Sequence, residues 1–214
     1  MSSSQSTYEE VSSSSTSTTK SNEQNPVKKM QSSKQKIISP NKHIDIIIAN
    51  ILLHILAENK KTKDYYKKIN ANRDGHFTIQ MRPSISLLDY LRRIIKYLRM
   101  ELSTLIISMI YIDRICKEKI FLNEYNIHRV MLIAIYIAYK YNEDCIYDNK
   151  YLALVSGISN AEMILLEQDF LELIDFKLYV NEETFKQYKN SLNKRIEELI
   201  LCEIKQQQQQ PSLL

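Results

Sequence analysis

The sequence feature that most constrains the fold lies in residues 123–144, where the consecutive positions 130–138 carry no charged side chain. They read Val-Met-Leu-Ile-Ala-Ile-Tyr-Ile-Ala. A helix with apolar side chains on every side is stable in water only when other elements enclose it. Residues 123–144 are therefore predicted to form the central helix of a domain, wrapped by neighbouring helices.

Two amphipathic segments precede this central one. Pro83 and Ser84 suit the first turn of a helix, and apolar residues then recur at three- and four-residue steps as far as Leu98. Residues 101–117 repeat the same spacing. Each segment is therefore predicted to be a helix with one apolar face.

Two more helices are predicted after the central one. A short helix over residues 151–155 ends at Gly157. Ser159 caps a longer helix, with Glu162 three residues on in the pattern of a capping box. The inner face of this helix is expected to carry Met163, Leu166, Phe170, Leu171 and Ile174. Because the whole chain has only 2 Gly and 4 Pro, hairpins are disfavoured and the predicted fold class is all-α.

The ends of the chain differ in composition from the helical part. Residues 1–36 are rich in Ser, Thr, Gln and Lys, and residues 206–210 are all Gln. Such sequences cannot offset the entropy cost of ordering themselves. Residues 59–74 are polar and are predicted to be a connector. The expected regions are a disordered tail (1–36), an N-terminal helix (40–60), a five-helix domain (82–180), a C-terminal helix (181–205) and a disordered Gln-rich end (206–214).

The sequence has no pattern typical of catalysis or metal binding. The His residues have no metal-ligand spacing, the Cys residues form no C-x-x-C pair, and no Ser or Cys sits in a nucleophile motif. Asn70, Asn72 and Asp74 imitate the start of a calcium loop, but its twelfth position, which should be Glu, is Met81. We therefore expect no enzymatic activity, cofactor, metal or small-molecule substrate.

Charge and hydropathy also limit the partners. The formal net charge of +4 is modest and the basic residues are dispersed, so no nucleic-acid partner is expected. The longest apolar stretch, residues 44–56, is interrupted by Asp45, Asn50 and His54, so no membrane span is expected. Unpaired cysteines and the lack of a targeting signal lead us to expect a location in the cytoplasm or the nucleus.

Several segments, in the order of the five predicted helices, carry more specific motifs than apolar spacing alone. The first reads Pro-Ser-Ile-Ser-Leu-Leu-Asp-Tyr-Leu-Arg-Arg-Ile from Pro83, and the second reads Leu-Ile-Ile-Ser-Met-Ile-Tyr-Ile-Asp-Arg from Leu105. The segments in the third, fourth and fifth predicted helices are residues 126–129 and 134–141, 149–151, and 157–159 with 162–167. In this order they resemble the five helices of the cyclin box, and they cover about 95 residues, which is the size of one box. The chain is therefore expected to hold a single cyclin box, with an additional N-terminal helix and a short C-terminal helix.

Three short motifs are most similar to the P-type cyclins, a group named for its phosphate-signalling members. They are Pro-x-Ile-Ser at Pro83, Asn-x-His-Arg at Asn126 and Gly-Ile-Ser at Gly157. The resemblance implies a protein without activity of its own. It implies that the chain forms a heterodimer with a cyclin-dependent protein kinase, grips the kinase C helix and activation segment, and activates the enzyme.

The resemblance also implies which residues contact the kinase. Lys140 and Glu167 correspond to the lysine and glutamate that hydrogen-bond to kinase backbone, and Asp113 to the aspartate that supports this lysine. The remaining expected contacts are Tyr141, Glu143, Phe170 and Phe176. From the residues alone, a solvated helix end is the favoured interpretation of Lys140, and the resemblance favours the interface instead.

Two features depart from the family. The arginine that many cyclins carry five residues before the aspartate of the first helix is replaced by Ser84, with Arg82 nearby. The internal salt-bridge network is therefore expected to be rearranged. Pro83 interrupts the patch around this arginine, with which mitotic cyclins recruit substrates. Too few residues follow Val180 for a second box.

Several alternatives stay open at this point. Ser39-Pro40 has the form of a proline-directed phosphorylation site and, equally, of a helix cap. Because the general transcription factor TFIIB also uses the cyclin box, one alternative function is a module that binds nucleic acid or other proteins. Another is an adaptor that binds a kinase without activating it.

Overall fold

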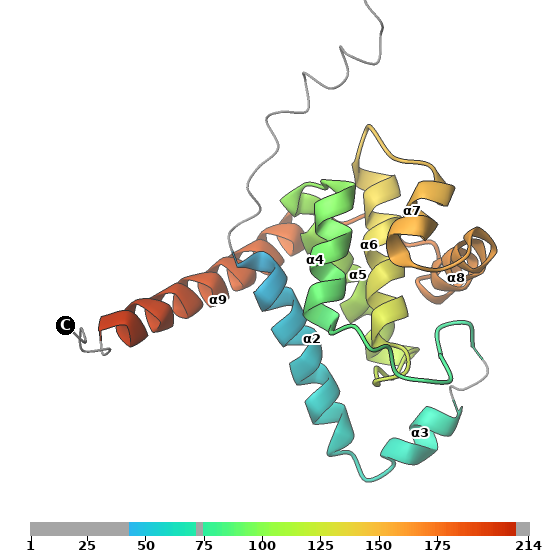
Figure 1. Ribbon diagram of the computed structural model, residues 1–214, viewed down its shortest axis with the longest axis horizontal. Coiled ribbons are helices and arrows are strands. Elements are labelled where there is room, and N and C mark those ends of the chain that lie inside the picture. The colour runs from blue at the N-terminus through green and yellow to red at the C-terminus, as the bar shows by residue number, and fades with distance from the viewer. Residues whose placement is uncertain (1–42, 72–74, 209–214) are drawn as a thin grey trace, which may run out of the picture. The chain divides into compact units, whose positions relative to one another are not determined.

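The computed structural model describes residues 43–71 and 75–208, and every regular element among these residues is a helix (Figure 1). The all-α prediction is therefore confirmed. The helices are α2 (Ile44–Lys60), α3 (Tyr65–Ala71), α4 (Leu87–Leu98), α5 (Leu102–Glu118), α6 (Ile127–Asn142), α7 (Asn149–Ser156), α8 (Asn160–Leu173) and α9 (Glu182–Gln208). The predicted tail (1–36), Ser39 and residues 209–214 lie outside the described residues, as do 72–74 of the calcium-like segment.

Helix α6 is the central helix that the sequence predicts. Its buried residues include every position from Val130 to Tyr139. Helix α5 lies along it, and α4 and α8 also pack against it (Figure 1). Helices α5 and α6 are antiparallel, because Asn142 at the end of α6 donates hydrogen bonds to Ser103 and Thr104 at the start of α5. The neighbouring helices thus cover all sides of α6.

Side-chain caps fix where three of the surrounding helices begin. Ser86, Asp148 and Ser159 each accept a hydrogen bond from the backbone nitrogen three residues on, at 3.1, 2.8 and 3.0 Å. Helix α4 therefore begins after Ser86, whereas the sequence predicted a start at Ser84. The end of α7 is as predicted, since Gly157 has the left-handed φ of 73° that closes the helix.

Glu162 has a different partner from the one that a capping box requires. Its carboxylate forms an ion pair with Arg129 of α6. Arg129 also donates a hydrogen bond to the carbonyl of His76 at 2.5 Å. One arginine thus ties together α6, α8 and the segment before α4.

Helix α3 lies in the segment that was predicted to be a connector, so that prediction is wrong at this point. Its residue Tyr65 is buried and donates a hydrogen bond to Glu124, which lies in the segment between α5 and α6. The Tyr65 ring also packs edge-to-face on Phe121, with centroids 5.9 Å apart. These contacts come from a distant part of the chain, so the local sequence gives little sign of them.

Helices α2 and α9 pack against the five-helix core from outside. One side of α2 is buried, through Ile44, Ile48 and Leu52, and it packs on α4 and α9. Helix α9 is anchored near its middle by the buried Leu192 and Ile196. It continues to Gln208, past the predicted end at residue 205, and its C-terminal part extends away from the other helices (Figure 1).

Candidate protein-interaction site

Lys140 and Glu167 meet where the last turn of α6 approaches α8. Lys140 Nζ lies 2.6 Å from Glu167 Oε1. The Lys140 side chain is 32% exposed and that of Glu167 17%, so the pair lies at the surface with the carboxylate more enclosed. The structure thus brings the two predicted residues together, while their role toward a partner stays a prediction.

Tyr136, one helical turn before Lys140, adds a buried hydroxyl to this pair. The hydroxyl oxygen lies 2.7 Å from Asn149 Oδ1 and 3.3 Å from Glu167 Oε2, and Lys140 Nζ lies 5.0 Å from the ring centroid. Burial, together with the nearby Glu167 carboxylate, raises the pKa of the Tyr136 hydroxyl, which therefore stays protonated. Sequence analysis missed Tyr136 because it lies in an apolar run. Its four-residue spacing from Lys140 is the signal that could have found it.

Asp113 has different partners from the one implied by the resemblance. Its carboxylate accepts a hydrogen bond from the Tyr188 hydroxyl at 2.5 Å and pairs with Lys117 Nζ at 2.9 Å. Burial and the Asp113 carboxylate raise the pKa of Tyr188, which stays a hydrogen-bond donor. Asp113 therefore anchors α9 to α5, and Lys140 has its ion pair with Glu167 instead. The prediction that Asp113 supports Lys140 is therefore wrong for this structure.

Glu143, just after α6, is used within the domain. Its Oε1 accepts hydrogen bonds from the backbone nitrogen of Glu101 at 2.8 Å and from the Thr104 hydroxyl at 2.6 Å. Because the Glu101 side chain does not cap α5, Glu143 satisfies a backbone donor at that helix end. The neighbouring Tyr141 is 55% exposed. Of these two predicted contacts, Tyr141 has the free surface that a partner needs.

The two predicted phenylalanines have opposite environments. Phe170 is 0% exposed, and its ring packs edge-to-face on Phe77 with centroids 6.4 Å apart. It lies on the inner face of α8 with Met163 and Leu166, so the prediction that it contacts a partner is wrong. Phe176, in contrast, is 67% exposed.

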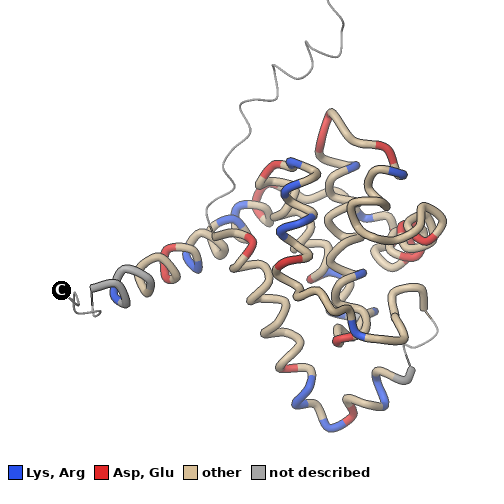
Figure 2. The backbone as a smooth tube through the Cα atoms, in the orientation of Figure 1, with Lys and Arg blue, Asp and Glu red and all other residues tan. Residues whose placement is uncertain are grey.

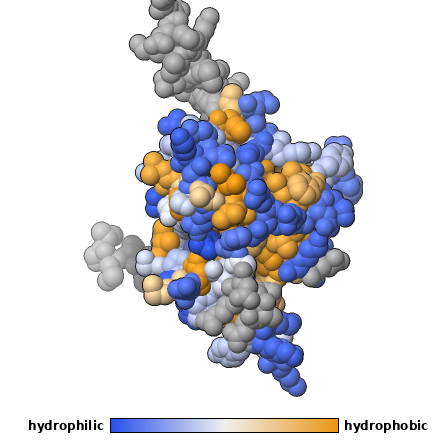
Figure 3. Space-filling view, turned by 90° about the vertical axis from the view of Figure 1, so that its right-hand side faces the viewer, coloured by the Kyte–Doolittle hydropathy of each residue, from blue (hydrophilic) through white to orange (hydrophobic). Residues whose placement is uncertain are grey.

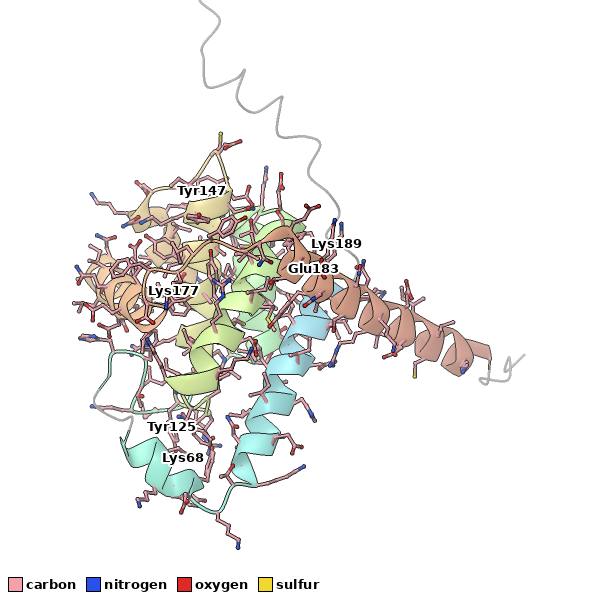
Figure 4. The ribbon with its side chains drawn as sticks, turned by 180° about the vertical axis from the view of Figure 1, so that it is seen from behind. Lys68, Tyr125, Tyr147, Lys177, Glu183 and Lys189 are labelled. Atoms are coloured by element: carbon pink, nitrogen blue, oxygen red, sulfur yellow. The ribbon has the colours of Figure 1, made fainter. Side chains whose placement is uncertain are left out.

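Phe176 belongs to a segment between α8 and α9 that α5 holds in place. Arg114 donates hydrogen bonds to the carbonyls of Lys177 and Tyr179, at 2.6 and 3.0 Å. Asp175 and Phe176 both have left-handed backbone angles, with φ of 53° and 55°. Lys177, labelled in Figure 4, marks this segment on the side opposite to the view of Figure 1. These Arg114 hydrogen bonds hold the backbone and leave the Tyr179 side chain 74% exposed. Sequence analysis did not single out Tyr179.

Arg82, two residues before Ser84, forms an ion-pair network with Glu124, while the expected rearrangement of the family's network stays a prediction. Arg82 and Lys60 both pair with the Glu124 carboxylate, which also accepts the hydrogen bond from Tyr65. Burial raises the pKa of Glu124, but the Tyr65 hydrogen bond and the two cations lower it, and the lowering dominates. This carboxylate therefore joins α2, α3 and the segment before α4.

The outer surface combines dispersed charge with separate apolar side chains. Figure 2 shows Lys and Arg on several helices, with a group of lysines where α2 meets α3. Figure 3 shows apolar and polar side chains interspersed on the face that carries α7 and α8. Exposed apolar residues of these helices are Leu154 (72%), Leu165 (41%) and Ile164 (39%). Apolar side chains scattered singly in this way are normal on a protein surface, so they do not by themselves mark a binding site.

The part of the chain that the structure describes has neither a group of metal-binding side chains nor a membrane-spanning helix. No three or more His, Cys, Asp or Glu side chains in residues 43–71 and 75–208 are grouped so that they could hold a metal ion. Among the same residues, no helix combines the length and hydropathy needed to cross a membrane.

Comparison with known families gives the arrangement its context. The family described as Cyclin matches residues 3–178. The chain belongs to the cyclin family. Cyclins are non-catalytic regulatory subunits, so the prediction that the chain is not an enzyme is confirmed.

Individual cyclins of two plants are similar to this chain. Cyclin-U4-3 of Arabidopsis thaliana is 34% identical over 161 residues, which cover 74% of this chain and 73% of the relative. Cyclin-U4-1 of the same plant is 37% identical over 117 residues, covering 54% and 58%. Cyclin-P4-1 of Oryza sativa subsp. japonica is 36% identical over 109 residues, covering 50% and 51%. Because U-type and P-type cyclins both match, the predicted P-type grouping is not specifically confirmed.

Proposed function

We propose that this cyclin is the regulatory subunit of a cyclin-dependent protein kinase, which it binds and activates. The observation that carries the proposal is the partly exposed pair of Lys140 and Glu167 at the junction of α6 and α8. By the resemblance, these positions match the lysine and glutamate with which cyclins hydrogen-bond to kinase backbone. As part of the same proposal, we place the protein in the cytoplasm or the nucleus.

The chemistry of the pair fits this role. An ammonium group only donates hydrogen bonds and an ionised carboxylate only accepts them. Once the pair opens, Lys140 can donate to a backbone carbonyl and Glu167 can accept from a backbone N–H. A partly exposed ion pair stabilises a fold by only about 1 kcal/mol or less, so opening it costs little.

Exposed aromatic rings provide the apolar part of the proposed surface. Tyr141 is 55% exposed, Phe176 67% and Tyr179 74%. Aromatic side chains are enriched in protein interfaces and often dominate their binding energy. A kinase is active when its C-helix glutamate pairs with the strand lysine. A cyclin that binds this arrangement more tightly than the inactive one shifts the population toward it.

The proposal is tested with purified proteins. Each cyclin-dependent kinase encoded in the same genome is produced separately, and its affinity for the full-length chain and its phosphorylation rate are measured. We expect one or more kinases to bind, with at least a tenfold higher rate in the complex. Binding without a change in rate would indicate an adaptor, and no binding to any of these kinases would refute the proposal.

A further inference from the structure

Glu167 has a different neighbour at each of its two carboxylate oxygens. Oε1 lies 2.6 Å from Lys140 Nζ, while Oε2 lies 3.3 Å from the Tyr136 hydroxyl oxygen. The same hydroxyl oxygen lies 2.7 Å from Asn149 Oδ1, in the first turn of α7. One buried hydroxyl group thus stands between two side chains that both present an oxygen to it.

A tyrosine hydroxyl has one proton, so it donates to only one of these oxygens at a time. In the free chain, the shorter distance assigns the proton to Asn149. The side-chain amide of Asn149 can turn so that its nitrogen faces the hydroxyl instead. In that orientation Asn149 donates to the Tyr136 oxygen, and the Tyr136 proton is free for Glu167.

Resting on the proposed function, we propose that Tyr136 is a positioning residue for kinase binding: its hydroxyl takes over from Lys140 as the donor that holds Glu167. When Lys140 turns to a kinase carbonyl, the Glu167 carboxylate loses its donor at 2.6 Å. Because a kinase backbone N–H donates to only one carboxylate oxygen, the other oxygen of Glu167 would be left without a donor in a desolvated interface, which is costly. The Tyr136 hydroxyl is already beside it, and an ionised acceptor attracts a proton donor more strongly than a neutral amide does.

The surroundings of Tyr136 favour this exchange. The residue is 1% exposed, so the core fixes the position of its ring. Asn149 is held in place by α7, whose N-terminus is capped by Asp148. Because burial keeps the hydroxyl protonated, a donor is present throughout the neutral pH range. Only the direction of one hydroxyl proton and the orientation of one amide change.

The first test is a double-mutant cycle on kinase affinity. It uses whichever of the separately purified kinases the wild type binds most tightly. Tyr136→Phe removes the hydroxyl alone and is expected to weaken binding roughly tenfold, as for a hydrogen bond to a charged group. In the Glu167→Gln background, Tyr136→Phe is expected to weaken binding about twofold or less. Equal weakening in both backgrounds would assign Tyr136 a purely structural role and overturn the proposal.

A control variant separates lost stability from lost positioning. Tyr90 is also buried, and its hydroxyl donates to the carbonyl of Ser156 at 2.9 Å, away from the pair of Lys140 and Glu167. Tyr90→Phe is expected to lower thermal stability about as much as Tyr136→Phe while leaving kinase affinity within about twofold. A similar loss of affinity in both variants would contradict the proposal.

Asn149→Asp gives a second test, in which the substituted side chain keeps its size and no buried group is removed. The new carboxylate lies in the first turn of α7, where negative charge is favourable, so the variant is expected to fold normally. It keeps the Tyr136 proton away from Glu167, so kinase binding is expected to weaken roughly five- to tenfold. Unchanged affinity would refute the exchange. If the wild type binds none of the purified kinases, the proposed function fails. If the wild type binds a kinase and Tyr136→Phe binds it with the same affinity, only the positioning role of Tyr136 is refuted.

Discussion

Replacing Lys140 by Ala is expected to affect binding far more than folding. In the free chain the change removes one ion pair, whose two side chains are 32% and 17% exposed. After allowance for solvent screening, the loss of folding free energy is about 1 kcal/mol, which lowers the melting temperature by only a few degrees. The Tyr136 hydroxyl, 3.3 Å from Glu167 Oε2, can turn its proton from Asn149 to this carboxylate, so Glu167 is not left isolated.

In the proposed kinase complex the same change has a larger effect. A kinase carbonyl loses a charged donor inside a desolvated interface, at a cost of about 2–5 kcal/mol. This corresponds to a loss of affinity between roughly thirtyfold and several thousandfold. Glu167→Ala is expected to fall in the same range, because a backbone N–H then loses its acceptor.

The assay compares thermal unfolding of the free variants with kinase affinity measured by calorimetry. Lys61→Ala is a control for the loss of an ion pair, since Lys61 pairs with Glu58 at 2.6 Å near the end of α2 and neither residue belongs to the proposed surface. It is expected to leave affinity within about twofold. If Lys140→Ala unfolds the free chain, the pair serves mainly to join α6 and α8. If it binds and activates the kinase as the wild type does, Lys140 is not part of the interface.

Three further predictions concern other parts of the molecule. Arg114→Ala should lower the unfolding free energy by about 1–2 kcal/mol because two backbone carbonyls lose a charged donor, and Arg114→Lys should recover only part of this, as denaturant titration can show. The pKa of Glu124 is lowered below 4.5 in the folded chain, so the stability that this carboxylate contributes is present above pH 4.5 and is lost as the pH falls through its folded-state pKa. Melting curves of Glu124→Gln should therefore show a smaller loss of stability below pH 4.5 than those of the wild type. Finally, the chain should not bind duplex DNA at physiological salt, and a submicromolar complex that weakens by orders of magnitude between roughly 50 and 200 mM salt would support a nucleic-acid module instead.

The parts of the fold that depend on local sequence could be predicted. The apolar run of residues 130–138 predicted the buried α6, and the spacing of Met163, Leu166 and Phe170 predicted the inner face of α8. Ser159 marked a helix start, because a cap depends on the residues next to it. Phe170 is buried on this inner face, so the periodicity was a better guide than the expectation that it contacts the kinase.

The features that sequence reasoning missed depend on residues far apart in the chain. Helix α3 is held by Tyr65 and its contacts with the segment between α5 and α6. The hydrogen bond between Asp113 and Tyr188 depends on how α9 returns to α5. In the candidate site, Lys140 and Glu167 could be chosen from the resemblance, but Tyr136 is indistinguishable from a core residue until the helices are placed. Long-range packing decides such contacts, and periodicity does not reveal it.

The backbone between α8 and α9 has a consequence for how this protein would respond to selection. Phe176 has a left-handed φ of 55°, a conformation that costs a non-glycine residue roughly 1–2 kcal/mol, and its ring is 67% exposed. Glycine at this position would relieve the strain, so a laboratory selection for thermal stability alone should favour Phe176→Gly. A selection for partner binding should retain the ring. If the two selections diverge at this codon, the strained backbone is the thermodynamic cost of displaying an aromatic side chain to a partner.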